Sequence, residues 1–291
     1  MTRKFAFLCT IGVTLYVFVL PVQAQKLHLN IMAGLANYSG DLQSKSFTLQ
    51  QSHPVISGGL SYEISDKFYL RTDGSITSLS ADDKLSKTIF QLHRNLNFRS
   101  KIYEANLLLE YNILNPYEHK LIPYVFAGVG VFHFNPYTYD SLGKLVYLKY
   151  QGTEGQGLKE YPGTQLYSKI QMNIPFGAGV KLALSDNIRV GLEMGIRKLF
   201  TDYLDDVSGN YPDINLIRQY RGARAASLVF RGDELKSPLS YPGAGKPRGN
   251  PGVKDSYYFC LVRLSYRLPF EIFGQHNSGF KRARVDCPKV L

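Results

Sequence analysis

Tryptophan is absent from this chain of 291 residues, and cysteine occurs only three times. One of the cysteines, Cys9, lies within an apolar run at residues 5–20 that follows two basic residues. Such a run, ending at Val22-Gln23-Ala24, is typical of a secretory signal peptide, so we expect residues 1–24 to be removed on export. A lipidated cysteine would begin the mature chain, and the position of Cys9 argues against one. The two remaining cysteines are too few for a disulfide framework.

Long apolar runs are also missing after residue 24. No segment there offers the about 18 consecutive apolar residues that a transmembrane helix needs. An exported chain can nevertheless span a membrane as a β-barrel, because barrel strands alternate apolar and polar residues and have weak overall hydropathy. Removing Arg3 and Lys4 with the signal lowers the formal net charge from +11 to +9, so the mature protein is basic.

The sequence lacks the short motifs that carry common chemistry. None of the six histidines stands beside a recognisable nucleophile motif, and G-x-S-x-G, H-E-x-x-H and C-x-x-C do not occur. The acidic stretch at residues 201–211 does not follow the spacing of a calcium-binding loop. We therefore expect no enzyme activity, no cofactor and no metal. An outer-membrane hydrolase or acyltransferase that uses a histidine base is the alternative.

Strand-like alternation of apolar and polar residues is the dominant pattern. It is clearest at residues 187–200, where Val190 and Leu192 alternate with Arg189 and Glu193. Eight such segments occur, and little of the chain is typical of a long helix. We expect strands at residues 27–37, 54–64, 67–78, 98–112, 122–134, 170–184, 187–200 and 256–268.

The connections between these strands alternate in length. Three are short, at Ser65-Asp66, at residues 115–120 and at Ser185-Asp186. Four are long, at residues 38–53, 79–97, 135–169 and 201–255. Short turns at one end and long loops at the other are typical of outer-membrane barrels, whose short turns face the periplasm.

These lengths predict an all-β fold: an eight-stranded antiparallel outer-membrane β-barrel with four long extracellular loops and short periplasmic turns. The barrel domain would cover residues 25–268, and a basic periplasmic tail would follow at residues 269–291. A soluble lipocalin-like barrel or sandwich is the alternative. Because tryptophan is absent, tyrosine and phenylalanine would form the aromatic belts at the membrane interfaces. The expected belt tyrosines are Tyr38, Tyr62, Tyr103, Tyr111, Tyr203, Tyr258 and Tyr266.

Charged residues gather on the polar faces of the expected strands, which would face the barrel interior. These residues are nearly balanced in sign: Arg71, Asp73, Glu104, Glu110, Lys181, Arg189, Glu193, Arg197 and Arg263. The interior of an eight-stranded barrel is just wide enough to be filled by side chains, and unpaired charges there would be costly. We therefore predict a salt-bridged plug, with a pore or proton pathway as the alternative.

The acidic stretch at residues 201–211 follows the seventh strand on the long-loop side. We expect Asp202, Asp205 and Asp206 to form a structural rim that pairs with nearby arginines, and Tyr203 to belong to the aromatic belt. Short aspartate side chains can cap a chain reversal by accepting backbone N–H bonds. A divalent cation that bridges the rim to lipopolysaccharide is the alternative.

Two basic segments lie outside the expected strands. In residues 214–254, eight basic side chains outnumber Asp233 and Glu234 by +6, so this loop either neutralises lipopolysaccharide phosphates or stays solvated and mobile. The tail contains Lys281, Arg282 and Arg284, which we expect to meet a periplasmic partner or the anionic cell wall. No nucleic-acid partner is expected for an exported barrel.

Several segments in order along the chain resemble the PorG family, the outer-membrane β-barrel component of the type IX secretion and gliding machinery. The most specific is "FTDYLDDVSGNY" at residues 200–211. The others are "YSGDL" at 38–42, "RNLNF" at 94–98, "FAGVGVFHFNP" at 126–136, "TEGQG" at 153–157 and "IPFGAGVK" at 174–181. The resemblance implies a non-enzymatic protein that anchors or assembles the periplasmic ring built from PorK and PorN and does not conduct substrate. A surface adhesin or lipopolysaccharide-binding barrel is the alternative function.

Overall fold

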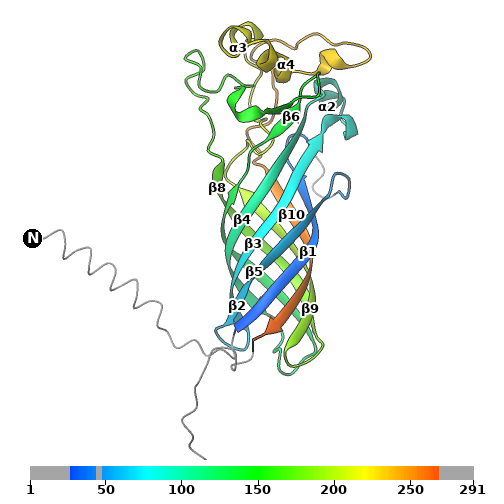
Figure 1. Cartoon of the computed structure of the whole chain (residues 1–291), viewed down its shortest axis with the longest axis vertical. Helices are drawn as coiled ribbons and strands as arrows, with labels where there is room; N and C mark the ends of the chain where they lie inside the picture. Colours follow the sequence, from blue (N-terminus) through cyan, green and yellow to red (C-terminus); the bar gives the residue numbers. More distant parts are fainter. Residues whose placement is uncertain (1–26, 44–47, 269–291) are drawn as a thin grey trace, which may run out of the picture.

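The computed structural model describes residues 27–43 and 48–268. The expected signal peptide at residues 1–24 lies outside the described residues. So does the basic tail, with Lys281, Arg282 and Arg284. Eight long antiparallel strands dominate the rest (Figure 1). They are β1 (Leu27–Ser39), β2 (His53–Glu63), β3 (Phe68–Asp82), β4 (Asn97–Asn112), β5 (Leu121–His133), β8 (Ile170–Ala183), β9 (Ile188–Leu199) and β10 (Ser256–Arg267).

The eight strands close into a barrel. Each pairs with its neighbour in the chain, and the first strand pairs with the last along its whole length, from His28 opposite Arg267 to Ser39 opposite Ser256. Closure matters because an open edge would leave unpaired backbone N–H and C=O groups. The predicted eight-stranded antiparallel barrel is confirmed, and its short connections at residues 64–67, 113–120 and 184–187 all lie at one end (Figure 1).

The barrel wall is apolar outside and polar inside. Ile56 and Leu192 expose 67% and 61% of their surface, whereas Arg71 and Glu110 are fully buried. A closed barrel with this distribution of side chains can place its outer wall in lipid with every strand hydrogen-bonded. The protein is an outer-membrane barrel.

The expected belt of tyrosines is partly wrong. Tyr62, Tyr103, Tyr111 and Tyr266 lie on the outer wall, but Tyr38 lies on the inward face of β1 and is fully buried. The physical reason is the period of two: Tyr38 shares the parity of His28, Asn30 and Met32, which point inward. The ring of Tyr203 stacks on Tyr167 and therefore does not belong to a lipid-facing belt. The hydroxyl of Tyr258 donates to the backbone oxygen of Thr48, so an extracellular loop covers that residue.

The long loops fold into a cap at the other end of the barrel, and they include several short elements that the alternation pattern did not predict (Figure 1). They are η2 (Asp83–Leu85), α2 (Ile89–Arg94), β6 (Tyr137–Tyr139), β7 (Leu145–Tyr147), η3 (Leu148–Tyr150), α3 (Ile214–Arg221), α4 (Ala223–Val229) and η4 (Gly232–Glu234). No helix among the described residues is both long and apolar enough to cross a membrane.

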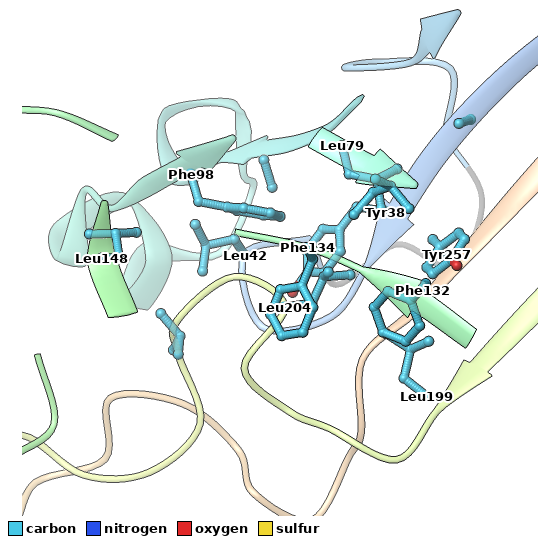
Figure 2. Close-up of a cluster of buried hydrophobic side chains, with 14 of the residues drawn as sticks. Tyr38, Leu42, Leu79, Phe98, Phe132, Phe134, Leu148, Leu199, Leu204 and Tyr257 are labelled. Atoms are coloured by element: carbon cyan, nitrogen blue, oxygen red, sulfur yellow. The ribbon is translucent and has the colours of Figure 1, made fainter. Parts of the chain in front are cut away.

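Two apolar clusters hold the cap together. The larger one fills the outer end of the barrel, where Tyr38, Phe98, Phe132 and Phe134 gather around Leu204 (Figure 2). The smaller cluster lies mainly in the fourth loop, where Ile217 and Val229 pack with the rings of Tyr211 and Phe230, and it includes Leu158 of the third loop. The fourth loop is therefore folded around an apolar core that it shares with the third loop, which argues against the alternative of a solvated and mobile segment.

Candidate functional site

The barrel lumen is filled by an ion-pair network centred on Glu110. Arg263 Nη1 lies 2.6 Å from one Glu110 carboxylate oxygen, and Arg71 Nη1 lies 3.1 Å from the same oxygen. Lys181 donates to the other oxygen and also to the side-chain oxygen of Asn112, at 2.9 Å. Three cations thus share one fully buried carboxylate, so Glu110 is the electrostatic centre of the lumen.

Arg71 links this centre to two further acids. Its two terminal nitrogens bond Glu193 in a fork, at 2.6 and 2.9 Å, and its Nε lies 2.8 Å from Asp73. Tyr124 donates to Glu193 at 2.8 Å, and a Cβ at Gly179 would lie 2.5 Å from that tyrosine ring. Glycine at this inward position therefore leaves the room that the tyrosine occupies.

A second layer of the network lies nearer the outer end. Arg197 pairs with Glu104 at 3.2 Å, and its guanidinium lies 3.9 Å from the ring centre of Phe259. Tyr257 donates to the other Glu104 oxygen at 2.6 Å. The structure thus joins eight of the nine predicted inward charges in ion pairs. The ninth, Arg189, is buried near the periplasmic end and donates to the Tyr69 hydroxyl at 3.3 Å.

The extracellular cap has a polar network built on two buried arginines that sequence reasoning did not single out. Arg94, at the end of α2, bonds both oxygens of Asp83 at 2.8 Å. It also donates to the backbone oxygens of Asp41 at 2.9 Å and Arg248 at 2.6 Å. One side chain therefore ties the first, second and fourth long loops together.

Arg248 joins the fourth loop to the third. Its Nη1 lies 2.8 Å from Glu154 and donates to the backbone oxygen of Asp206 at 2.7 Å. Glu154 in turn accepts from the backbone N–H groups of Ser208 at 2.9 Å and Gly209 at 3.0 Å. The segments at residues 38–42, 94–98, 153–157 and 200–211, which lie far apart in the sequence, thus meet in one buried cluster.

The three predicted rim aspartates are buried in this cluster, but hydroxyl groups bond them where arginines were expected. Ser208 donates to Asp202 at 2.7 Å, and Tyr38 lies 2.6 Å from Asp205. Asp206 accepts from the hydroxyls of Thr153 at 2.6 Å and Tyr167 at 2.8 Å. Arg248 reaches only the backbone of Asp206. Within the described residues, no group of three or more His, Cys, Asp or Glu side chains is arranged to hold a metal ion.

Tyr38 connects two buried carboxyl groups. Its hydroxyl oxygen lies 2.6 Å from Asp205 and 2.8 Å from Asp255. A tyrosine hydroxyl has a single proton to donate, so the second short contact requires a proton on one of the two carboxyl groups. Burial raises the pKa of both Asp205 and Asp255 well above the ordinary range, in agreement with this geometry.

The cap is expected to lose stability as pH rises through about 6. Burial raises the pKa of Asp206 from 3.8 to about 6, so the folded cap binds a proton that the unfolded cap releases. This stabilisation is complete below the unfolded pKa and is lost as pH rises through the folded pKa, a change of roughly 2–3 kcal/mol. Amide protection factors of the cap, corrected for intrinsic exchange, should fall between about pH 4 and about pH 8.

The matched variant for this prediction is Asp206→Asn. The backbone φ of Asp206 is +67°, and asparagine tolerates this left-handed conformation. Asparagine keeps one acceptor oxygen where Asp206 offers one each to Thr153 and Tyr167, its amide nitrogen can donate to the other hydroxyl oxygen, and it has no titrating group. The variant should therefore show a smaller fall in protection than the wild type. An identical fall in both proteins would exclude Asp206 as the titrating group.

Several solved structures are similar to this chain. The structure is similar to Neisserial surface protein A, with a TM-score of 0.41, 10% identity and coverage of 83% of this chain and 97% of that chain. It is also similar to Ail of Yersinia pestis in complex with the heparin analogue sucrose octasulfate (TM-score 0.39, 9% identity, 82% and 96% coverage). The outer membrane protein OprG from Pseudomonas aeruginosa is similar with a TM-score of 0.37 and 12% identity, and the match covers 82% of this chain and 94% of that chain.

No curated protein matches the sequence. A family model described as "Domain of unknown function (DUF6089)" matches residues 6–227. This match spans seven of the eight barrel strands and the loops that carry Arg94, Glu154 and the rim aspartates. The chain belongs to the DUF6089 family.

Proposed function

We propose that this protein is a non-enzymatic outer-membrane component of the type IX secretion machinery that anchors or assembles the periplasmic ring of PorK and PorN type. The observation that carries the proposal is the filled lumen, where Arg71, Lys181 and Arg263 converge on Glu110. A barrel filled in this way suits an anchor better than a conduit for exported proteins.

The proposal also draws on the segments that resemble the PorG family. Those at residues 38–42, 94–98, 153–157 and 200–211 supply the partners of the buried cap network. The residues that carry the resemblance therefore hold the folded cap together in this chain. In the proposed arrangement, the outer wall is embedded in outer-membrane lipid and lipopolysaccharide, and the ring proteins bind from the periplasm through the short turns and the tail residues Lys281, Arg282 and Arg284.

A surface adhesin or lipopolysaccharide-binding protein is the second candidate. The observation that favours it is the distribution of charge on the fourth loop. Arg231 and Arg248 are buried in ion pairs, but six other basic side chains of this loop are exposed and can meet lipopolysaccharide phosphates. The six are Arg218, Arg221, Arg224, Lys236, Lys246 and Lys254.

Affinity purification of the tagged protein from crosslinked, gently solubilised membranes tests the first candidate. We expect PorK- and PorN-type ring proteins to co-purify with the full chain and to be strongly reduced with a chain cut after Phe270, because the cut removes the basic tail. Retention of the ring proteins by the truncated chain would move the contact to the short turns.

The control is a chain with glutamine at Arg218, Arg221 and Arg224, all on the extracellular side. It should retain the ring proteins as the wild type does. Absence of ring proteins from both the full-length and the control samples would contradict the secretion assignment. Weaker binding of lipopolysaccharide by the control chain would then favour the second candidate.

A further inference from the structure

The periplasmic mouth of the barrel contains a cavity that the lumen plug does not use. Its volume is about 630 Å³, and we call it the periplasmic cup. The turn at residues 116–120, the turn at residues 183–186, Arg189 and Arg267 line it. Arg189 and Arg267 belong to the inward faces of β9 and β10, so the cup lies at the end of the lumen. Figure 1 shows the short turns at this end of the barrel.

Arg189 differs from the other four predicted inward cations in having no carboxylate close to it among the described residues. The nine inward residues comprise five cations and four acids, and the other four cations each have a carboxylate oxygen within 4.0 Å. Arg189 has none among the described residues, although its side chain is only 6% exposed. Its one hydrogen bond within the described part of the chain is to the Tyr69 hydroxyl, at 3.3 Å. A guanidinium has five N–H donors, so most of those of Arg189 have no acceptor within residues 27–43 and 48–268.

The buried carboxylate of this end is already occupied by other donors. Tyr117 contacts both oxygens of Glu63, at 2.7 and 2.9 Å, and Tyr69 donates to it at 3.2 Å. His28 Nε2 lies 3.7 Å from the same group. Arg267 is held against Tyr117, donating to its hydroxyl at 3.2 Å. The cup therefore presents two guanidinium groups on the lumen side.

The rim of the cup carries both signs of charge. Lys120 adds a third permanent cation, and His119 stands beside it. Glu118 and Asp186 are the acids of the rim, and Glu118 accepts from the side chain of Asn115 at 2.9 Å. The inner part of the cup is therefore positive, whereas its acids lie at the exposed edge.

We propose that the periplasmic cup binds a carboxylate-bearing segment of a periplasmic protein, with Arg189 as the residue that receives the carboxylate. This inference rests on the proposed anchoring function and identifies the chemistry of the partner. A guanidinium fork matches a carboxylate in a bidentate geometry, and the cavity has the size of typical ligand pockets. The cup opens at the end of the lumen, so a protein segment entering along the barrel axis reaches it more directly than a lipid headgroup from the surrounding leaflet. The chain's own tail is basic and is a poor match in charge.

The test uses the full mature protein in detergent micelles and a fluorescein-labelled hexaglutamate peptide, with binding followed by fluorescence anisotropy. Arg189→Gln should weaken peptide binding by about tenfold, the loss of one charge-assisted pair. Lys120→Gln, at an exposed position that folding does not require, should weaken it by about two- to fivefold. Arg218→Gln, on the extracellular cap, should bind as the wild type does. Heat-dependent mobility in SDS gels checks that each variant is folded.

Equal affinity of the wild type and Arg189→Gln for the peptide would overturn the proposal. If Arg189→Gln does not fold, equal affinity of the wild type and Lys120→Gln would do the same. Stronger binding to phosphatidylglycerol vesicles than to the peptide, lost in Arg189→Gln, would assign the cup to a lipid and also overturn it. The measurement contains no ring proteins. If the peptide does not bind but the ring proteins still co-purify with the full chain, only the proposal for the cup is wrong. If the peptide binds but the ring proteins do not co-purify, only the secretion assignment is wrong.

Discussion

Replacing Glu110 with alanine should lower the free energy of unfolding of the barrel by about 3–5 kcal/mol, because three buried cations would lose their shared carboxylate. Arg263 would keep a contact of 3.9 Å to Glu193, and Lys181 would keep its bond to Asn112 and its position 4.4 Å from the ring centre of Tyr124. None of these contacts replaces a carboxylate centred among three positive charges. Urea unfolding in lipid vesicles, followed by circular dichroism and by gel mobility, measures the change.

Two further variants test whether the loss of stability comes from the uncompensated cations of the lumen. Glu160→Ala removes an exposed glutamate whose bond is to Tyr220, and it should change stability by less than about 0.5 kcal/mol. Adding Lys181→Met to Glu110→Ala removes one of the uncompensated cations and should recover part of the loss. A Glu110→Ala barrel as stable as the wild type would contradict the ion-paired lumen.

The second large effect is expected at the cap. Arg248→Ala should destabilise the cap locally by about 3–5 kcal/mol, because Glu154 would stay buried without its counter-charge and the backbone oxygen of Asp206 would lose a donor. Proteolysis of intact cells should then cleave the third and fourth loops, while the barrel itself keeps its gel mobility. Barrel strands are held by their own ladders and by the lumen network, so they do not depend on this arginine.

Arg218→Ala is the matched control for the cap. Arg218 is exposed on α3, and its loss removes a positive charge from the same loop without uncovering a buried acid. It should leave the loops as resistant as in the wild type. Equal resistance of Arg248→Ala and Arg218→Ala would contradict the view that the buried arginines hold the loops together.

The barrel was predictable because its determinants are local and periodic. In β9, the alternation from Ile188 to Leu199 fixes which face meets lipid and which meets the lumen. The inward direction of charges such as Glu193 follows from the same period. The order of short and long connections then gives the topology. Tyr38 shows how parity decides an aromatic position: its type favours an interfacial belt, but its place in the strand puts it inside.

The cap was not predictable in the same way, because its determinants are far apart in the sequence. Arg94 and Arg248 are separated by 154 residues and meet through a side chain and a backbone oxygen. Neither residue lies in a periodic pattern that reveals its partner. The folded state of the fourth loop was not predictable from the sequence for a related reason. Its charge and its glycines are typical of a mobile segment, whereas a few apolar residues such as Ile217 and Phe230 suffice to build a core.

The extracellular and periplasmic ends of the barrel therefore differ in how they are closed. The extracellular end is closed by folded loops and a buried network around Arg94 and Arg248. The periplasmic end consists of short turns around a cup that contains an arginine without a carboxylate partner among the described residues. This asymmetry supports the proposal that the protein binds its partner from the periplasm.

The most direct test of this account is the electrical conductance of the purified protein in planar lipid bilayers, because the central claim is that side chains seal the lumen. The account predicts no stepwise conductance for the wild type. It predicts openings for a chain in which Glu110 and Arg71 are both replaced by alanine, since this removes the centre of the network. Stable, stepwise conductance of the wild-type protein would contradict the sealed lumen and, with it, the anchoring function that rests on it.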